Sequence, residues 1–390
     1  MSKLWIGSAY ARRGAHMAKA RAIQGAVRVA PGRLLFDSFG GQYSDSPRAI
    51  HEELMGRRTT LSPVWGMDPG FPLGPPEAEV VRHGSARHMA ELGRAQFIVA
   101  NEHRDIRDYR KKSGTTYVQT WHGTPLKRIG FDHDRWNRRG RRRLAEAVAI
   151  WDYVVSPNPF TSGVFRSGFG YEGEILETGY PRNDLLSSPD RDERRTRARS
   201  ALGLDPDVRA VFYVPTWRDD LIDARGRQGF RLALDLERMA ERLGGDHVVL
   251  LRLHHRISSA ELPDLGSFTL DVSRHPDIRE LYLAADVLLT DYSSAMFDFA
   301  ITRKPMLFYT YDLAAYRDEV RGFYFELTDE APGPLAETTD DVVDALEDLD
   351  AVRRSYAERY DRWHARYCAL EDGRASARVV DAVFGAAASA

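Results

Sequence analysis

Short apolar runs alternate along this chain with amphipathic stretches of helical period, beginning near Leu34. The ends of the runs carry Gly, Pro, Asn and Asp, which favour turns. In the first half the expected strands are Arg33–Phe36, Gln96–Ala100, Thr116–Trp121, Tyr153–Ser156 and Ile175–Glu177. The helices expected between them lie near residues 47–56, 84–93, 141–150 and 158–167. This alternation of strand and helix predicts a parallel, doubly wound α/β sheet.

The same alternation resumes after a polar, Arg-rich stretch, residues 187–200, which we interpret as a domain junction. The strands expected in the second half are Val211–Val214, His247–Leu253, Ser267–Asp271, Val287–Thr290 and Pro305–Phe308, with helices near residues 232–243, 277–284 and 293–301. The pattern therefore predicts an α/β protein with two Rossmann-like domains that face each other across a cleft. We expect a segment at 1–33, domains at 34–186 and 187–338, and a helical segment with a loose tail at 339–390.

Composition excludes several classes of protein. With 43% hydrophobic and 29% charged residues, the chain of 390 residues is neither disordered nor fibrous. The single cysteine, Cys368, excludes an intrachain disulfide and a Cys-rich metal site, and it favours a reducing compartment. No apolar run approaches the ~20 residues that span a bilayer, and no signal-peptide pattern is present. We therefore expect a cytoplasmic protein, either soluble or attached to a surface.

The net charge of −2 conceals an asymmetry between the two halves of the chain. Residues 1–200 carry 33 basic and 22 acidic side chains, a balance of +11, whereas residues 201–390 carry 22 and 35, a balance of −13. Seven bases and no acids lie in residues 1–36, and six arginines lie in residues 135–143. Such segments either contact an anionic membrane or polyanion, or are simply solvated. Both interpretations stay open for these two segments.

Common cofactor motifs are missing from the sequence. It contains no G-x-x-x-x-G-K-[ST], no G-x-G-x-x-G after a strand and no H-E-x-x-H. This argues against a P-loop NTPase, a dinucleotide oxidoreductase and a zinc peptidase. His254, His255 and His275 match no standard spacing of metal ligands. We expect neither a metal site nor a cofactor.

His122 is the first candidate for chemistry. It follows the strand expected at 116–121 and precedes Gly123-Thr124-Pro125, which favours an exposed turn. In open parallel sheets, ligands bind beyond the carboxyl ends of the strands. Histidine suits a general base that takes a proton from a hydroxyl group. The alternative is a structural histidine that is hydrogen-bonded beneath a turn.

Cations and hydroxyl groups follow three strands of the second half. Thr216 and Arg218 come after the strand at 211–214, and His254 comes after the strand at 247–253. An arginine binds phosphate through two parallel hydrogen bonds, although Arg218 has Asp219 and Asp220 as alternative partners.

After the strand at 287–290, Asp291 is followed by Ser293 and Ser294, which open an expected helix. Asp291 or Ser293 can cap that helix. The free N–H groups at such a helix start also favour phosphate. Together the three strand ends predict a site for a phosphate-bearing donor, and His122 a site for a hydroxyl acceptor.

At this point a family is recognisable. The sequence closely resembles the CDP-glycerol glycerophosphotransferases, which are the teichoic-acid primases and polymerases and their capsule-polymer relatives. The resemblance covers residues 33–366, and the motifs that carry it are QTWHGTPLKRIG (119–130), WDYVVSPNPF (151–160), GYPRNDL (179–185), YVPTWR (213–218), LRLH (251–254), DVLLTDYSSAMFD (286–298), PMLFY (305–309) and RGFYF (321–325).

The resemblance implies a GT-B fold and a CDP-glycerol donor, with an acceptor domain first and a donor domain second. It implies that an acceptor hydroxyl attacks the phosphorus that bears glycerol and that CMP leaves. His122 matches the proposed base, and His254 the histidine that stabilises the diphosphate. The donor-binding residues that it implies are Thr216, Arg218, His254, Asp291, Ser293, Ser294 and Asp298. The acceptor-side candidates are Gly123, Thr124 and Lys127.

The expected partners are CDP-glycerol or a similar CDP-alditol and a lipid-linked or polyanionic acceptor, with peripheral contact at the inner face of the cell membrane and no nucleic acid. Three alternatives remain: ribitol-phosphate transfer from CDP-ribitol, a GT-B transferase that uses a nucleotide sugar, and a non-enzymatic polyanion or membrane scaffold.

Overall fold

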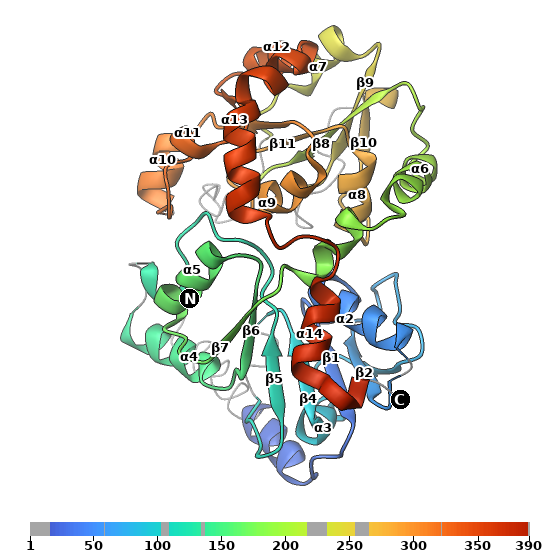
Figure 1. The fold of residues 1–390 in the computed structure, drawn as a ribbon, viewed down its shortest axis with the longest axis vertical. Helices are drawn as coiled ribbons and strands as arrows, with labels where there is room; N and C mark the ends of the chain where they lie inside the picture. The colour runs from blue at the N-terminus through green and yellow to red at the C-terminus, as the bar shows by residue number, and fades with distance from the viewer. Residues whose placement is uncertain are drawn as a thin grey trace, which may run out of the picture. The chain divides into compact units, whose positions relative to one another are not determined.

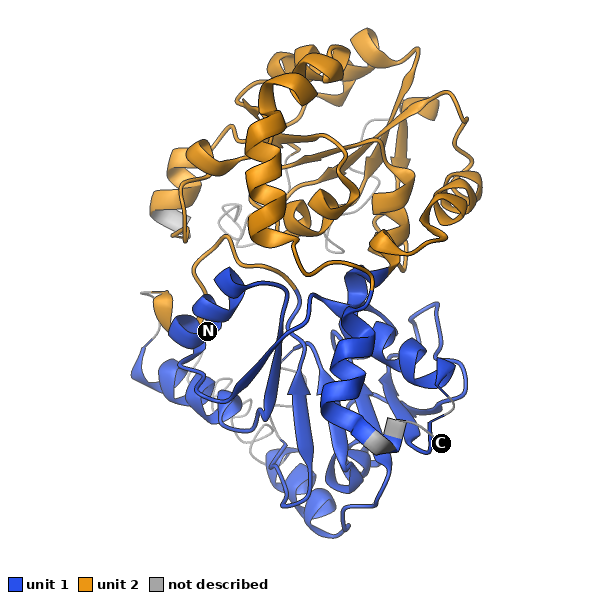
Figure 2. Cartoon of the chain, in the orientation of Figure 1, with its two compact units in different colours: residues 1–122, 136–184, 374–390 blue, residues 123–135, 185–373 orange. Residues whose placement is uncertain are grey.

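The computed structural model describes residues 16–57, 59–102, 109–133, 137–216, 232–253, 265–320 and 322–388. The chain forms two compact units, and each contains one parallel β-sheet (Figure 1). Figure 2 shows the two units in different colours. Unit 1 comprises residues 1–122, 136–184 and 374–390, and unit 2 comprises residues 123–135 and 185–373. The expectation of two parallel α/β sheets is confirmed.

Unit 1 contains a seven-stranded parallel sheet in the order β3-β2-β1-β4-β5-β6-β7. Its strands are β1 (Arg33–Asp37), β2 (Ser62–Met67), β3 (Glu79–Arg82), β4 (Phe97–Ala100), β5 (Thr116–Gln119), β6 (Tyr153–Ser156) and β7 (Glu174–Glu177). Its helices are α2 (Asp45–Gly56), α3 (Ala86–Arg94), α4 (Arg138–Val148), α5 (Pro159–Phe169) and α14 (Ala375–Phe384).

The core of unit 1 joins the centre of the sheet to α14, a helix from the far end of the chain. Leu34 and Phe36 of β1 are fully buried and belong to one apolar cluster with Val379 and Phe384 of α14. Figure 1 shows α14 beside α2, and the carboxylate of Asp184 accepts hydrogen bonds from the first backbone N–H groups of α14. The C-terminal segment is therefore part of this core.

Unit 2 contains a six-stranded parallel sheet in the order β10-β9-β8-β11-β12-β13. Its strands are β8 (Arg209–Val214), β9 (His247–Leu251), β10 (Thr269–Asp271), β11 (Val287–Thr290), β12 (Met306–Tyr309) and β13 (Leu335–Ala336). Its helices are α6 (Arg191–Ala201), α7 (Leu236–Leu243), α8 (Ile278–Ala284), α9 (Ala295–Phe299), α10 (Leu313–Ala315), α11 (Leu327–Glu330), α12 (Thr339–Glu347) and α13 (Leu349–Tyr367).

Three strands were not expected from the sequence. β2 contains Pro63 and Gly66, which favour turns, yet its last five residues are buried beside β1. β3 lies at the edge of the sheet and carries the charged residues Glu79 and Arg82, so it lacks an apolar run. β13 spans two residues, which is too short for a periodic pattern.

The division of the chain also differs from the one expected at two places. Residues 123–135 group with unit 2, although they directly follow β5 of unit 1. Residues 374–390 group with unit 1 rather than continuing the preceding helical segment. Apolar packing decides the second case, since Val379, Val380 and Phe384 are buried in the core of unit 1.

The Arg-rich stretch at 187–200 largely forms α6, a packed helix of unit 2 rather than a polar linker. Arg195 donates to the backbone carbonyls of Leu283 and Ala285 at the end of α8, at 2.9 and 3.0 Å. Arg195 and Arg199 also bind the two carboxylate oxygens of Asp286, at 2.7 and 3.1 Å. The arginines thus satisfy the unpaired carbonyls at the helix end and attach α6 to the start of β11.

Asp286 gives a first testable prediction. Burial acts to raise the pKa of Asp286, but the Ala210 N–H and the two arginines outweigh it and hold that pKa below its usual range. We expect Asp286→Asn to lower the free energy of unfolding at pH 7 by about 2 kcal/mol, because two partly buried cations lose their partner. The contribution of Asp286 is complete above its unfolded-state pKa of about 3.9 and is lost as the pH falls through the lower folded-state pKa, so the deficit should shrink in acid.

Urea unfolding followed by circular dichroism measures this difference. Asp361, which is largely exposed and paired with Arg303, provides the control. Asp361→Asn should change the free energy of unfolding by no more than about 0.5 kcal/mol. Equal effects of the two substitutions would contradict the role given to Asp286.

Candidate active site

His122 lies just beyond the carboxyl end of β5, on a strained turn. Trp121 has a φ of +53°, a left-handed conformation that is costly for a bulky residue. Its backbone N–H donates to Gln119 Oε1 at 2.8 Å, and its buried ring packs edge-on against Phe169 of α5. The anchored indole holds the turn in this conformation and thereby positions the backbone of His122.

A backbone carbonyl fixes the tautomer of His122. Nδ1 of His122 lies 2.9 Å from the carbonyl oxygen of Asn101, which follows β4. Because a carbonyl can only accept, Nδ1 carries the proton, and in the neutral ring Nε2 has a free lone pair. The side chain is 29% exposed, and its Nε2 lies 4.0 Å from Glu102 Oε1. The histidine therefore has one nitrogen committed to positioning and one available for proton transfer.

The residues around Asn101 connect three strand ends. Asn101 is fully buried; its side chain accepts from Phe39 N and donates to Ser38 Oγ, both at 3.1 Å. The ring of Phe39 stands edge-on to the His122 imidazole at 5.6 Å, and the ring of Trp121 stacks on the same imidazole at 4.3 Å. The loop after β1 thus positions His122 through Asn101, a link that the sequence reasoning missed because it depends on the order of the strands.

The acceptor-side candidates belong to the segment that groups with unit 2. Gly123 has a φ of +159°, which is extended backbone, and Thr124 is almost fully buried. Lys127 forms an antiparallel bridge with Phe323, and its ammonium group lies 5.9 Å from the ring of Tyr316. Lys127 is thus the least buried of the three residues, whereas Thr124 is buried within its unit.

In unit 2 the ends of β8 and β11 are joined by Asp291. The buried carboxylate of Asp291 accepts from Thr216 N at 2.9 and 3.0 Å and from Tyr292 N at 2.5 Å. Thr290 Oγ1 also donates to Val214 O at 2.7 Å. Asp291 therefore positions the turn that carries Thr216.

The helix start after β11 differs from the one expected. α9 begins at Ala295, spans five residues and continues into a 3-10 turn at Ala300–Thr302. Ser294 occupies the N-cap position without a side-chain cap bond, and Ser293 Oγ accepts from Ala295 N at 3.3 Å. Of the two residues expected to cap this helix, Ser293 bonds to its first residue, whereas the carboxylate of Asp291 accepts from Thr216 N and Tyr292 N.

The remaining predicted donor residues fall into two groups. Asp298 lies on α9 and is buried. Arg218 and His254 lie outside the described residues, as do the first 15 residues of the basic N-terminal segment.

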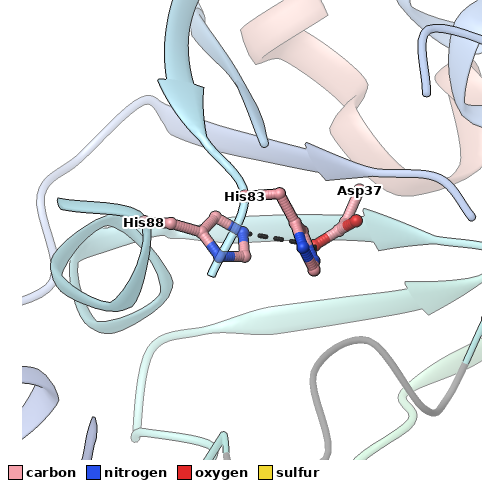
Figure 3. A group of neighbouring side chains, drawn as sticks. All are labelled: Asp37, His83 and His88. Carbon is pink, nitrogen blue, oxygen red and sulfur yellow. Dashed lines mark ion pairs between the residues drawn. The ribbon is translucent and has the colours of Figure 1, made fainter. Parts of the chain in front are cut away.

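A second cluster lies at the carboxyl edge of the unit 1 sheet. Figure 3 shows Asp37 from the end of β1, His83 just after β3 and His88 from α3, which lie close together. The sequence reasoning missed this cluster because its members are spread over 52 positions and meet only through the strand order β3-β2-β1.

Comparisons with known proteins agree on a family. The model of the family "CDP-Glycerol:Poly(glycerophosphate) glycerophosphotransferase" matches residues 20–385. The teichoic acid poly(glycerol phosphate) polymerase of Bacillus subtilis (strain 168) is 37% identical over 365 residues, which are 90% of this chain and 48% of the relative. This chain thus spans about half the length of that polymerase.

Two further proteins match over nearly their whole length. The teichoic acid glycerol-phosphate transferase of Staphylococcus aureus is 37% identical over 362 residues, 90% of this chain and 92% of the relative. The solved structure of the wall teichoic acid polymerase TagF has a TM-score of 0.89 at 35% identity and covers 98% of this chain and 96% of the other. A TagF variant with one histidine replaced by asparagine has been solved after a soak with CDPG, and it has a TM-score of 0.87 at 34% identity over 95% of this chain and 94% of the other.

Proposed function

The chain belongs to the CDP-glycerol:poly(glycerophosphate) glycerophosphotransferase family, a two-sheet fold of the GT-B type, and we propose that it transfers glycerol phosphate from CDP-glycerol to a hydroxyl group of a poly(glycerol phosphate) or lipid-linked acceptor. The observation that carries this proposal in the structure is the fixed tautomer of His122, whose Nδ1 is held by Asn101 O. A hydroxyl nucleophile needs a base at that point, and Nε2 supplies one.

The proposed reaction is a transfer of glycerol phosphate in which no atom changes its oxidation state. The acceptor oxygen attacks the phosphorus that bears glycerol, and its proton passes to Nε2 of His122. The bond between that phosphorus and the bridging oxygen breaks, and CMP leaves with the bridging oxygen. The product is a phosphodiester longer by one unit, and the proton on His122 returns to water before the next cycle.

The donor-binding groups of the proposal come from unit 2. Thr216 is held in place by Asp291, and Ser293 and Ser294 are half-buried at the start of α9. Arg218 and His254, outside the described residues, are the proposed cations for the diphosphate. Hydrogen-bond donors and cations that are already in position before the reaction stabilise the charge that develops on the leaving group. This stabilisation is usually the largest contribution to the rate.

The choice of donor is testable directly. Incubation of the purified chain with CDP-glycerol and a lipid-linked glycerol-phosphate acceptor should release CMP in proportion to the polymer formed. Rates with CDP-ribitol and with a UDP-sugar should be at least about 10-fold lower, since a site built around one alditol rejects other shapes. CMP release is measured by chromatography, and absence of turnover with every donor would refute the proposal.

The base is tested by His122→Asn. The asparagine amide can still donate to Asn101 O, so the turn should keep its structure while the base is lost. We expect kcat to fall by about 10²- to 10⁴-fold, with little change in the Kd for CDP-glycerol.

The half-buried His364 of α13 provides a matched control, and His364→Asn should keep near wild-type kcat. A His122→Asn enzyme that loses donor affinity but keeps its kcat would remove His122 from the base role.

The surface of α4 supports contact with a membrane. Arg138, Arg139, Arg141, Arg142 and Arg143 are all exposed on this helix, whose buried residues are Leu144 and Val148. No helix among the described residues is both long and apolar enough to cross a membrane. We propose that α4 attaches the protein to the anionic surface that carries the acceptor, because clustered arginines bind anionic lipid.

Neutralising Arg138, Arg141 and Arg142, which share one helix face, tests this contact. The triple change to Gln should weaken binding to phosphatidylglycerol vesicles at least about 10-fold, and added salt should reduce the difference. Vesicle co-sedimentation measures the affinity. The same number of charges removed from α13 (Arg353, Arg354 and Arg362 to Gln) provides the control; equal losses would refute a specific role of α4.

A further inference from the structure

The cluster of Asp37, His83 and His88 takes no part in the proposed reaction. Nε2 of His83 and Nε2 of His88 lie 3.3 and 3.2 Å from Asp37 Oδ2. One ligand atom from each residue can be chosen so that all lie within 4.8 Å of one another. The three side chains therefore present two imidazole nitrogens and a carboxylate oxygen to one point (Figure 3).

The carboxylate in this cluster is deeply buried beside the two imidazoles. The side chain of Asp37 is 0% exposed, that of His88 2% and that of His83 22%. The Oδ2 atom of Asp37 lies within reach of both Nε2 atoms, so the two imidazoles are the described groups that face its charge. Burying a carboxylate in this way costs several kcal/mol unless a cation or a proton lies beside it.

Gly66 of β2 makes the space for the two imidazoles. A Cβ atom at this position would lie 2.8 Å from His88 Nε2 and 3.5 Å from His83 Cδ2. The φ of Gly66 lies outside the left-handed region, so the backbone does not require glycine there. Because glycine weakens the interior of a strand, its presence is explained by the room that the cluster needs.

We propose that Asp37, His83 and His88 bind one divalent transition-metal ion, with Zn²⁺ as the best match. Two imidazoles and one carboxylate are a common ligand set for Zn²⁺ and its neighbours, whereas Mg²⁺ and Ca²⁺ prefer oxygen ligands throughout. Three protein ligands leave a fourth position for water. This proposal is independent of the transferase function.

Metal binding requires a change of tautomer at His88. Gly84 N donates to His88 Nδ1 at 3.2 Å, so in the neutral ring the proton lies on Nε2, toward Asp37. When Nε2 binds a metal, this proton moves to Nδ1, and the Gly84 contact must open. Gly84 has a φ of +71° in the turn between β3 and α3, so this turn is the segment that adjusts.

The metal would stabilise the fold rather than take part in catalysis. It would connect β1, β3 and α3, and Asp37 directly precedes Ser38 and Phe39, which hold Asn101. A bound ion would therefore support the loop that positions His122 through Asn101.

Calorimetric titration of the chelator-treated full chain tests the proposal. We expect one equivalent of Zn²⁺ per chain with a Kd below about 1 μM, no comparable binding of Mg²⁺, and a rise in Tm of about 5 °C at saturation. Asp37→Asn and His88→Gln should both abolish that equivalent and the rise in Tm.

Two controls keep the test decisive. His51 is a buried histidine of the same unit, bonded to Tyr43 OH at 3.2 Å, and His51→Gln should keep the zinc equivalent. Gly66→Ala leaves all three ligands in place but fills their space, and it should weaken zinc binding at least about 10-fold. If the wild-type chain binds no zinc more tightly than about 1 μM, or if Asp37→Asn and His88→Gln bind it equally well, the cluster is a proton-sharing group and the proposal is wrong.

Discussion

The function proposed for this chain depends on the parallel register of its two sheets. In a parallel sheet every strand ends at the same edge, so residues that follow different strands become neighbours. In unit 1, Asp37 pairs with Ala100 and Ala100 with Gln119, which places Ser38, Asn101 and Thr120 side by side. One carbonyl, that of Asn101, then orients His122. An antiparallel sheet would send alternate strand ends to opposite edges and separate these groups.

Local patterns predicted the centre of each sheet and the position of His122, because buried strands carry continuous apolar runs and histidine after a strand is a local signal. They did not predict β2, since Pro63 and Gly66 conceal its burial, or the helix in the Arg-rich stretch, since its partner Asp286 is 87 residues from Arg199. Contacts between distant residues leave no periodic signal. For the same reason, the sequence did not predict the hydrogen bond from Thr216 N to Asp291 or the cluster of Asp37, His83 and His88.

The acidic half of the chain repels an anionic CDP-alditol less than its charge of −13 implies. Residues 322–352 hold ten acids and no Lys or Arg, yet several of these acids face arginines of α7. Arg242 binds Asp344 and Glu347, and Arg238 binds Asp340. These exposed pairs contribute little to stability, but they reduce the field at the edge of the sheet that is proposed to bind the donor phosphates.

The contribution of α14 to unit 1 constrains how the protein is made. Val379, Val380 and Phe384 complete the core around β1, but the ribosome delivers them after all of residues 185–373. At about 5–20 residues per second, unit 1 waits on the order of ten seconds or more with part of its apolar core uncovered. The last residue of unit 2 is residue 373, so its chain is fully synthesised before that of unit 1, which began earlier. During that interval the nascent chain exposes the surface that chaperones recognise.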